Sequence, residues 1–179
     1  MPQRADETAR WHLFVTIGRA TRRAFLRIYN DRNEVSSPDF LRRLKAVPSM
    51  KIVKPLTDNG SQFTDRFTGK AKKPSGYHGF DREWILLGIE HRLLEPRQPQ
   101  TDGMVERFNG RIRKVLTLTR FRSRESLLIR LERYENLYND PLRRHALGHR
   151  TPLQAIRTWH TVRSELFNGK RKNPAGLAT

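Results

Sequence analysis

Asp58 raises the first chemical question in this sequence, because it follows an apolar run in the stretch "KPLTDNGSQF". A carboxylate in that place could hold a metal ion. Asp-Asn-Gly is also common turn chemistry, since Asp and Asn hydrogen-bond to their own backbone and Gly supplies positive φ. Those three residues alone favour the turn. The chain contains no cysteine, so any metal would be held by oxygen or imidazole.

The charge of the chain points to a polyanionic partner. There are 36 Lys and Arg residues against 18 Asp and Glu residues, and the formal net charge is +18. Such an excess is too large for an ordinary solvated surface, and nucleic acid is favoured over an anionic membrane. Lys72 and Lys73 lie in the Gly-, Lys- and Pro-rich segment 68–79, which we expect to be a loop that lies against phosphate or is only solvated.

Several other classes are disfavoured. The longest apolar run, "WILLGI", is far shorter than the roughly 20 residues that a transmembrane helix needs. No signal peptide opens the chain, and no "GxxxxGK" phosphate loop occurs, which argues against nucleotide hydrolysis. We expect a soluble intracellular protein with one modest globular unit and a tail.

The elements that must position these residues follow a strand, strand, helix, strand order. The β-branched and aromatic runs 11–19 and 22–30 predict a hairpin. Ser36 or Ser37 is expected to cap a helix over "PDFLRRLKAV", and "KIVKPL" (51–56) is expected to be the strand that leads to Asp58. A helix over 80–88 and a short strand within 89–95 follow.

The segment from Asp102 to about Leu118 predicts a helix with three faces. At about 100° per residue the apolar side chains form one stripe, the basic side chains a second face, and Glu106 lies on a third. The stripe consists of Val105, Phe108, Ile112, Val115 and Leu116, and the basic face of Arg107, Arg111 and Lys114. Taken alone, Glu106 would be a first-turn carboxylate that interacts favourably with the helix dipole, and the three basic residues would be an ordinary solvent-exposed face.

The remaining sequence predicts a helical tail. Residues 123–139 place Leu127, Leu128, Leu131, Tyr134 and Tyr138 at helical spacing, as a core or oligomer contact, with Tyr138 buried. His145 and His149 are four residues apart, but Gly148 and Pro152 argue against a helix that would aim both at one metal.

Read together, "LTDNGSQF" and "RQPQTDGMVERFNGRI" resemble the second and third acidic motifs of the DDE transposases of the retroviral-integrase superfamily. The segment "LFVTIGRATRRAFLRIY" looks like the second and third core strands, and "LYNDPLRRHALGHRTPLQAI" looks like the tail of insertion-sequence transposases. The resemblance implies an α/β, ribonuclease H-like mixed sheet with flanking helices over residues 1–121, followed by a basic helical region over 122–179.

The same resemblance implies the chemistry. Asp58 and Glu106 would be the catalytic metal ligands for Mg²⁺ or Mn²⁺, and two such ions can activate the attacking oxygen and stabilise the leaving oxygen of a phosphoryl displacement. Water would nick DNA at an element end, and the freed 3′ hydroxyl would attack target DNA. The candidate DNA contacts are Asn59, Lys72, Lys73, Arg107, Arg111 and Lys114.

Two departures from the family pattern stand out. The first catalytic Asp of the family lies on a central first strand upstream of residue 11, and "MPQRADETAR" lacks the apolar alternation of a strand, so Asp6 and Glu7 are poor substitutes. We therefore expect an N-terminally truncated core without that strand. Gly18 stands where relatives often have Asp, which should alter a turn.

Two functions remain open. The chain is either part of an enzyme of DNA transposition and integration, inactive without its first Asp, or a non-catalytic basic DNA-binding remnant. Expected partners are DNA, with a homo-oligomer or full-length transposase possible and no membrane, in a cytoplasmic, nucleoid-associated, bacterial-type setting. Without the first strand, the segments "HLFVTI" and "KIVKPL" should either flank an open slot or pair directly, and stability should be marginal.

Overall fold

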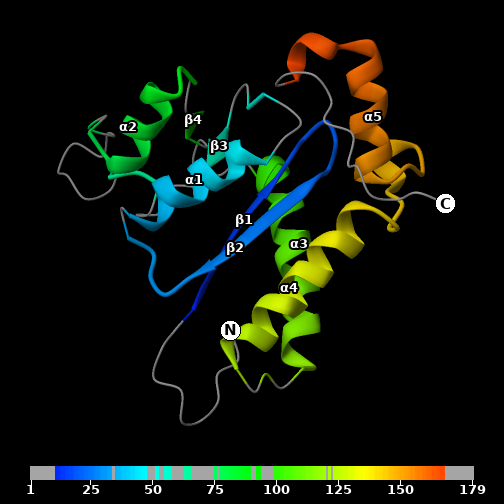
Figure 1. Ribbon diagram of the computed structural model, residues 1–179, viewed down its shortest axis with the longest axis horizontal. Coiled ribbons are helices and arrows are strands. Elements are labelled where there is room, and N and C mark those ends of the chain that lie inside the picture. Colours follow the sequence, from blue (N-terminus) through cyan, green and yellow to red (C-terminus); the bar gives the residue numbers. More distant parts are fainter. Residues whose placement is uncertain are drawn as a thin grey trace.

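The hairpin predicted near the N-terminus lies at the centre of the computed structural model (Figure 1). The structure describes residues 11–33, 35–47, 51–52, 55–57, 63–65, 75, 77–89, 92–93, 99–119, 121 and 123–167. Its strands are β1 (His12–Ile17), β2 (Ala24–Tyr29), β3 (Leu56–Thr57) and β4 (Arg92–Leu93). Its helices are α1 (Ser36–Ala46), α2 (Gly79–Leu86), α3 (Pro99–Thr117), α4 (Arg124–Asn139) and α5 (Pro152–Val162), with 3₁₀ turns η1 (His145–Leu147) and η2 (Ser164–Leu166).

The predicted hairpin is confirmed. Strands β1 and β2 pair antiparallel from His12 opposite Tyr29 to Ile17 opposite Ala24. The connection begins at Gly18, whose N–H donates to the Arg23 carbonyl at 2.8 Å. A Cβ at Gly18 would lie 2.9 Å from Thr21 Oγ1. A side chain at this position would therefore force Thr21 to shift, which gives the glycine a local role in the turn.

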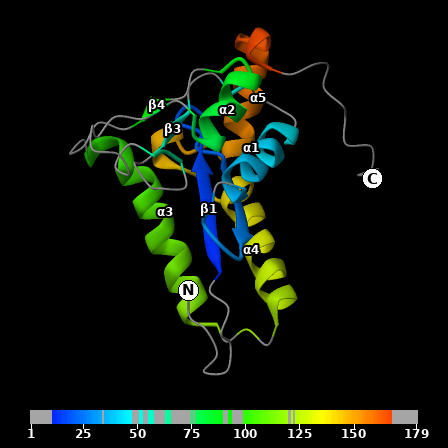
Figure 2. The same cartoon turned by 90° about the vertical axis from the view of Figure 1, so that its left-hand side faces the viewer.

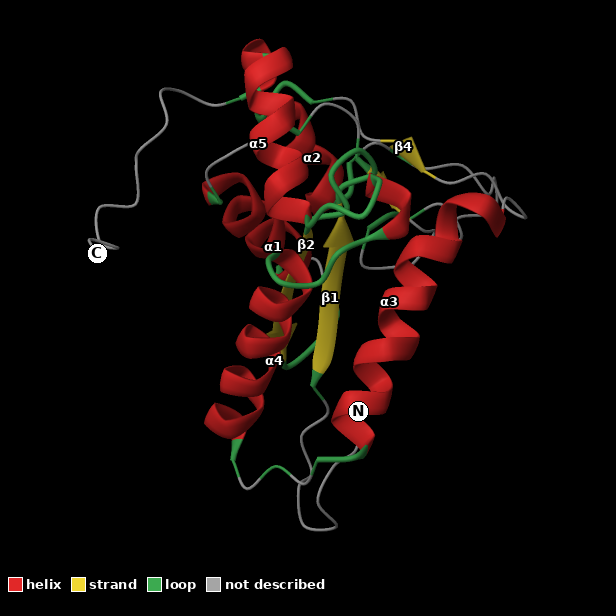
Figure 3. Ribbon diagram, turned by 90° about the vertical axis from the view of Figure 1, so that its right-hand side faces the viewer, coloured by secondary structure: helices red, strands yellow, loops and turns green. Residues whose placement is uncertain are grey.

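The two faces of the hairpin bury different helices, because side chains alternate along a strand. Ala24, Leu26 and Ile28 of β2 share one core with α3 and α4. The helices contribute Phe108, Ile112, Leu116, Leu127, Leu131 and Tyr138 to that core. Figures 2 and 3 show α3 and α4 running lengthwise beside the strands.

The opposite face of the hairpin is covered by α1. Phe14, Phe25 and Phe40 form the contact, and a further cluster of Leu41, Phe80 and Trp84 joins α1 to α2. The order of layers is therefore α3 and α4, then the hairpin, then α1 backed by α2. Burial of apolar side chains on both faces of the strands is what fixes the three layers.

The start of α1 corrects one prediction. The residue before the helix is Val35, and no side chain caps from that position. Ser36 and Ser37 are the first helical residues rather than caps. Instead, Asn33 Oδ1 accepts from the N–H groups of both Val35 and Ser36 at 3.0 Å. Asn therefore satisfies donors that the serines were expected to satisfy, by the same side-chain chemistry.

The second pair of strands is shorter than predicted. Lys51 and Ile52 lie outside a strand, and β3 comprises Leu56–Thr57 alone. It pairs in parallel with β4, which falls within the strand expected over 89–95. Within the described residues β1 pairs with β2 and β3 with β4, so "HLFVTI" does not pair directly with "KIVKPL" there. Whether stability is marginal stays a prediction.

The tail predictions are confirmed in most respects. Ser123 caps α4 in a reciprocal box with Ser126, and Leu127, Leu131 and Tyr138 are buried. Leu128 is an exception, because 41% of it is exposed. Helix α4 belongs to the same core as β2 and α3, and the division of the chain at residue 121 stays a prediction.

Glu135 joins α4 to β2 through an ion pair with Arg27, with 3.2 Å between Oε2 and Nη1. Its side chain is only 15% exposed. Burial raises the pKa of Glu135 above its ordinary value of 4.5, and the positive charge of Arg27 opposes that shift. The neutral carboxyl is therefore favoured by folding.

This shift predicts a pH dependence of stability. A raised pKa contributes stability that is present below about pH 4.5 and is lost as the pH rises through the folded value. The free energy of unfolding of the native chain, measured relative to Glu135→Gln, should therefore fall as the pH rises above 4.5. Denaturant titrations at several pH values measure this difference. A difference that grew with pH would contradict the prediction.

Candidate functional site

Helix α3 carries the described part of the candidate site. Phe108, Ile112 and Leu116 are at most 4% exposed, whereas Glu106, Arg107, Arg111 and Lys114 are exposed. The predicted separation of apolar, basic and acidic faces is therefore confirmed. The helix begins at Pro99 rather than Asp102, which places Glu106 roughly two turns from its start. The alternative of a first-turn carboxylate that interacts with the helix dipole is wrong for that reason.

On the outer face of α3, glycines without side chains lie next to the basic residues. Gly103 and Gly110 lie on it at helical spacing with Arg107 and Lys114, opposite the buried stripe. A Cβ at Gly110 would have nothing within 4 Å, and one at Gly103 would meet only the Arg107 guanidinium at 3.9 Å. Glycine inside a helix costs about 1 kcal/mol relative to alanine. No packing contact with the described residues requires glycine at either position.

Asp58 lies outside the described residues, as do Asn59, Lys72 and Lys73. Strand β3 ends at Thr57, so the chain enters Asp58 directly from a strand, as predicted. Its parallel partner β4 ends at Leu93, shortly before α3 begins. The structure thus places the elements on both sides of the site, and the approach of Asp58 to Glu106 stays a prediction.

The donor chemistry available here suits a hard cation. Asp58 and Glu106 offer carboxylate oxygens, which Mg²⁺ and Mn²⁺ prefer. In the described part of the chain no group of three or more His, Asp or Glu side chains could hold a metal ion. Glu106 is exposed, which leaves its oxygens accessible to a cation.

His145 and His149 do not share a helix. His145 begins η1, Gly148 ends it in the left-handed conformation, and His149 has φ of 61°. Their rings meet edge to face with centroids 5.1 Å apart. The prediction that Gly148 interrupts the helix is confirmed.

Two functional-site candidates near the end of α4 were not singled out from sequence. Asn139 is 8% exposed, and its amide bonds to both backbone groups of Ala24. Arg144 stacks on the Tyr138 ring, with its guanidinium carbon 3.7 Å from the ring centroid. Both lie in "LYNDPLRRHAL", part of the segment that resembles the tail of insertion-sequence transposases, but that resemblance assigns neither residue a role.

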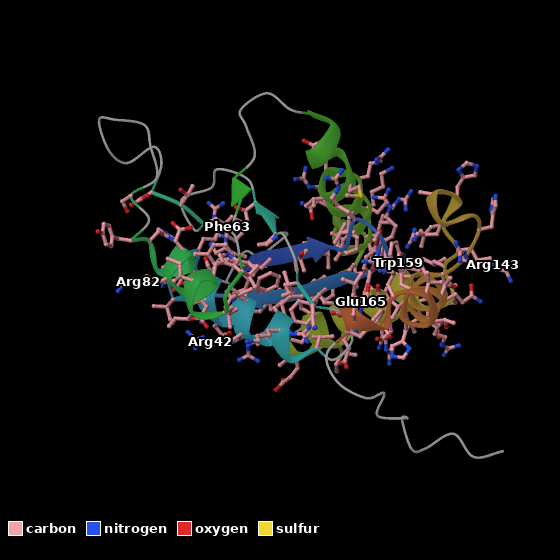
Figure 4. The ribbon with its side chains drawn as sticks, turned by 90° about the horizontal axis from the view of Figure 1, so that it is seen from above. Arg42, Phe63, Arg82, Arg143, Trp159 and Glu165 are labelled. Carbon is pink, nitrogen blue, oxygen red and sulfur yellow. The ribbon has the colours of Figure 1, made fainter. Side chains whose placement is uncertain are left out.

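Basic side chains lie at both ends of the molecule. Figure 4 shows Arg143 at the outer edge of the segment that follows α4, at the opposite end of the molecule from Arg42 and Arg82. None of the helices in the described ranges has the length and apolar character needed to cross a membrane.

Solved structures with the same fold are retroviral integrases. The catalytic core domain of BIV integrase superposes with a TM-score of 0.56 and 17% identity, over 84% of this chain and 88% of that domain. A chain of the simian T-cell lymphotropic virus intasome, solved with the PP2A regulatory subunit B56 gamma, superposes with a TM-score of 0.59 and 16% identity. That match covers 94% of this chain and 52% of the other, so this chain spans about half the length of that relative. The comparison with curated proteins gave no match.

The fold is therefore that of a ribonuclease H-like integrase catalytic core. Residues 87–152 match the integrase core domain family, a segment that includes β4, α3, α4 and η1. With the fold, this match makes the chain similar to the catalytic cores of DDE integrases and transposases. The matched segment contains Glu106 and crosses the predicted boundary at residue 121.

Proposed function

We propose that this chain acts on DNA in transposition or integration, in the lineage of insertion-sequence transposases. The observation that carries the proposal is the outer face of α3, where an integrase-type core exposes Glu106 together with Arg107, Arg111 and Lys114. The buried stripe fixes the orientation of the helix, so these four side chains are directed away from the core. A carboxylate beside a row of cations suits a site where a phosphodiester meets a divalent metal ion.

Each candidate residue has a separate role in this proposal. Asp58 and Glu106 would hold Mg²⁺ or Mn²⁺, which when bound polarises the phosphoryl oxygens and lowers the cost of charge on the attacking and leaving oxygens. Arg107, Arg111 and Lys114 hold the DNA backbone and set its position along α3. Gly103 and Gly110 leave the helix backbone open to close approach between those cations.

The sequence also supports a second function. Within residues 1–179 only Asp58 and Glu106 match acidic motifs of the family. A two-ion site needs enough carboxylates to hold both ions, so residues 1–179 alone would bind DNA without cutting it. Such a chain could associate with a copy of itself or with a full-length transposase. The simian virus relative is an intasome component.

DNA binding by the α3 face is the first test. The change Arg107→Gln with Arg111→Gln should weaken binding to all duplex sequences alike, because phosphate contacts carry no base information. The slope of log K against log salt should fall by about 0.9 for each phosphate that the variant no longer neutralises. Fluorescence anisotropy with two unrelated duplexes at several salt concentrations measures both quantities.

A matched control removes the same charge from a neighbouring surface. Arg130→Gln with Arg133→Gln acts on exposed residues of α4, and should leave the salt slope close to that of the native chain. A native chain with a flat salt dependence would exclude the proposed function. Selective loss of one duplex after the α3 changes would instead show that these arginines read bases.

A further inference from the structure

Arg144 is held in a fixed place without a carboxylate partner. Its guanidinium stacks on Tyr138, and Nη2 donates to the Tyr138 carbonyl at 3.2 Å. Its Nε is buried and has no hydrogen-bond partner. Among the described residues no Asp or Glu forms an ion pair with Arg144. Among the described residues the guanidinium donates only through Nη2, so the N–H groups of Nη1 remain available to an acceptor from outside.

An aromatic cluster ties Arg144 to α3. The Tyr138 ring meets the Phe108 ring edge to face with centroids 4.8 Å apart, and Tyr134 meets Phe108 at 5.6 Å. Phe108 lies on α3, so the stack that orients Arg144 also fixes its distance from that helix. The cluster is part of the main core, which makes this placement as rigid as the packing of α3 on α4.

Arg111 provides the second cation. It follows Phe108, whose ring contacts Tyr134 of α4, by nearly one helical turn and is exposed. Burial lowers the pKa of Arg144, and the nearby positive charge of Arg111 lowers it further. Two guanidinium groups that repel each other, with no ion-paired Asp or Glu in the part of the chain that the structure describes, favour binding of an anion.

Phosphate of a nucleic acid fits this pair better than other anions. A guanidinium fork matches phosphate oxygens with two parallel hydrogen bonds. The site also continues the row of Arg107 and Lys114 on α3, and a row of cations along a helix matches a chain of evenly spaced anions. Beyond it lie the exposed Arg143 and Arg150, which extend the basic surface past the end of α4.

We propose that Arg111 and Arg144 together hold one backbone phosphate of DNA, so that DNA bound along α3 continues over the α3–α4 junction toward residues 143–150. The inference rests on the proposed function and extends it to a contact that the α3 residues alone do not supply. Tyr138 and Phe108 are positioning residues here, because they act through Arg144.

The test compares charge-matched double variants in the full chain. Arg111→Gln with Arg144→Gln should lower the slope of log K against log salt by about 0.9, which is about an eightfold loss of affinity at 0.1 M salt. Arg144→Gln alone should already weaken binding, and no effect of that single change would show that Arg111 holds its phosphate without Arg144. The control is Arg42→Gln with Arg82→Gln, at the opposite end of the molecule (Figure 4). Arg82 also donates to a carbonyl, that of Tyr77, so the control removes a similar bond.

The outcomes separate the two proposals. If the native chain does not bind DNA, the proposed function fails. If it binds and the Arg111 and Arg144 variant equals the control, this inference fails together with the role of Arg111, while DNA binding by the chain stands. A fall in slope of about 1.8 would assign each arginine its own phosphate and overturn the shared site.

A second measurement, made without DNA, distinguishes loss of the phosphate site from loss of folding in the double variant. Inorganic phosphate, at ionic strength matched with chloride, should raise the midpoint of thermal unfolding of the native chain and of the control more than that of the double variant. Arg144→Lys keeps the charge and loses the fork, so its phosphate response should be intermediate. Equal phosphate responses in all four proteins would overturn the site.

Discussion

Replacing Asn139 by Asp is expected to lower the free energy of unfolding by about 3 kcal/mol, because it introduces a buried charge that has no partner of opposite charge. The Asn139 amide donates from Nδ2 to the Ala24 carbonyl and accepts at Oδ1 from the Ala24 N–H, both at 2.9 Å. Ala24 is fully buried, so no water can replace these bonds. A carboxylate in the same place keeps the acceptor, loses the donor, and faces a carbonyl oxygen. Chemical denaturation monitored by circular dichroism measures the change.

The same helix offers a matched control for this prediction. Asn136→Asp introduces an identical charge one turn earlier at an exposed position, and should change stability by less than about 0.5 kcal/mol. Part of the loss at Asn139→Asp should be recovered at low pH, because a protonated carboxyl can donate again. Equal stability of the two variants at neutral pH would show that the amide does not hold β2 to α4.

The second large effect concerns catalysis. Residues 1–179 in Mg²⁺ or Mn²⁺ should neither cut nor join DNA, because Asp58 and Glu106 are too few carboxylates to hold two ions in reactive geometry. In a chain extended at its N-terminus by a first strand with its Asp, strand transfer should appear. Asp58→Asn and Glu106→Gln should each abolish it in that chain while leaving DNA binding largely intact. Gel assays of labelled duplex DNA measure cleavage and joining.

The control keeps the size and charge of the change constant. Glu125→Gln, at an exposed position in the first turn of α4, should retain the strand transfer of the extended chain. Metal-dependent cleavage by residues 1–179 that is lost on Asp58→Asn would refute the expected inactivity. Cleavage that survives both Asp58→Asn and Glu106→Gln would assign the activity to other residues.

The helices could be predicted where one periodic signal determines the structure. The spacing of Phe108, Ile112 and Leu116 identifies the buried face of α3, and with it the exposed positions of Glu106 and Arg111. The same reasoning identifies the buried side of α4 from Leu127 and Leu131. It also placed the partly exposed Leu128 on the stripe predicted as a core or oligomer contact, because helical spacing alone does not give the width of the face that the hairpin covers.

Contacts between distant parts of the chain could not be predicted in this way. No local pattern distinguishes Asn139, whose partner is 115 residues away in sequence, from the exposed Asn136. Arg144 likewise depends on Tyr138 meeting Phe108 of another helix. The cap from Asn33 was within reach of sequence reasoning, but Ser36 and Ser37 were equally good caps by residue type.

The two hydrogen bonds between the Asn139 amide and the Ala24 backbone also have a consequence for the order of folding. Its two halves are separated by 115 residues, so this bond cannot form on β2 until residue 139 has been made. On the ribosome, the hairpin would emerge first, and the outer edge of β2 would lack its hydrogen bonds to Asn139 until α4 emerged. A nascent chain stopped before residue 139 should therefore leave that edge open to pairing with other strands, and chaperone binding should be strongest over this interval of synthesis.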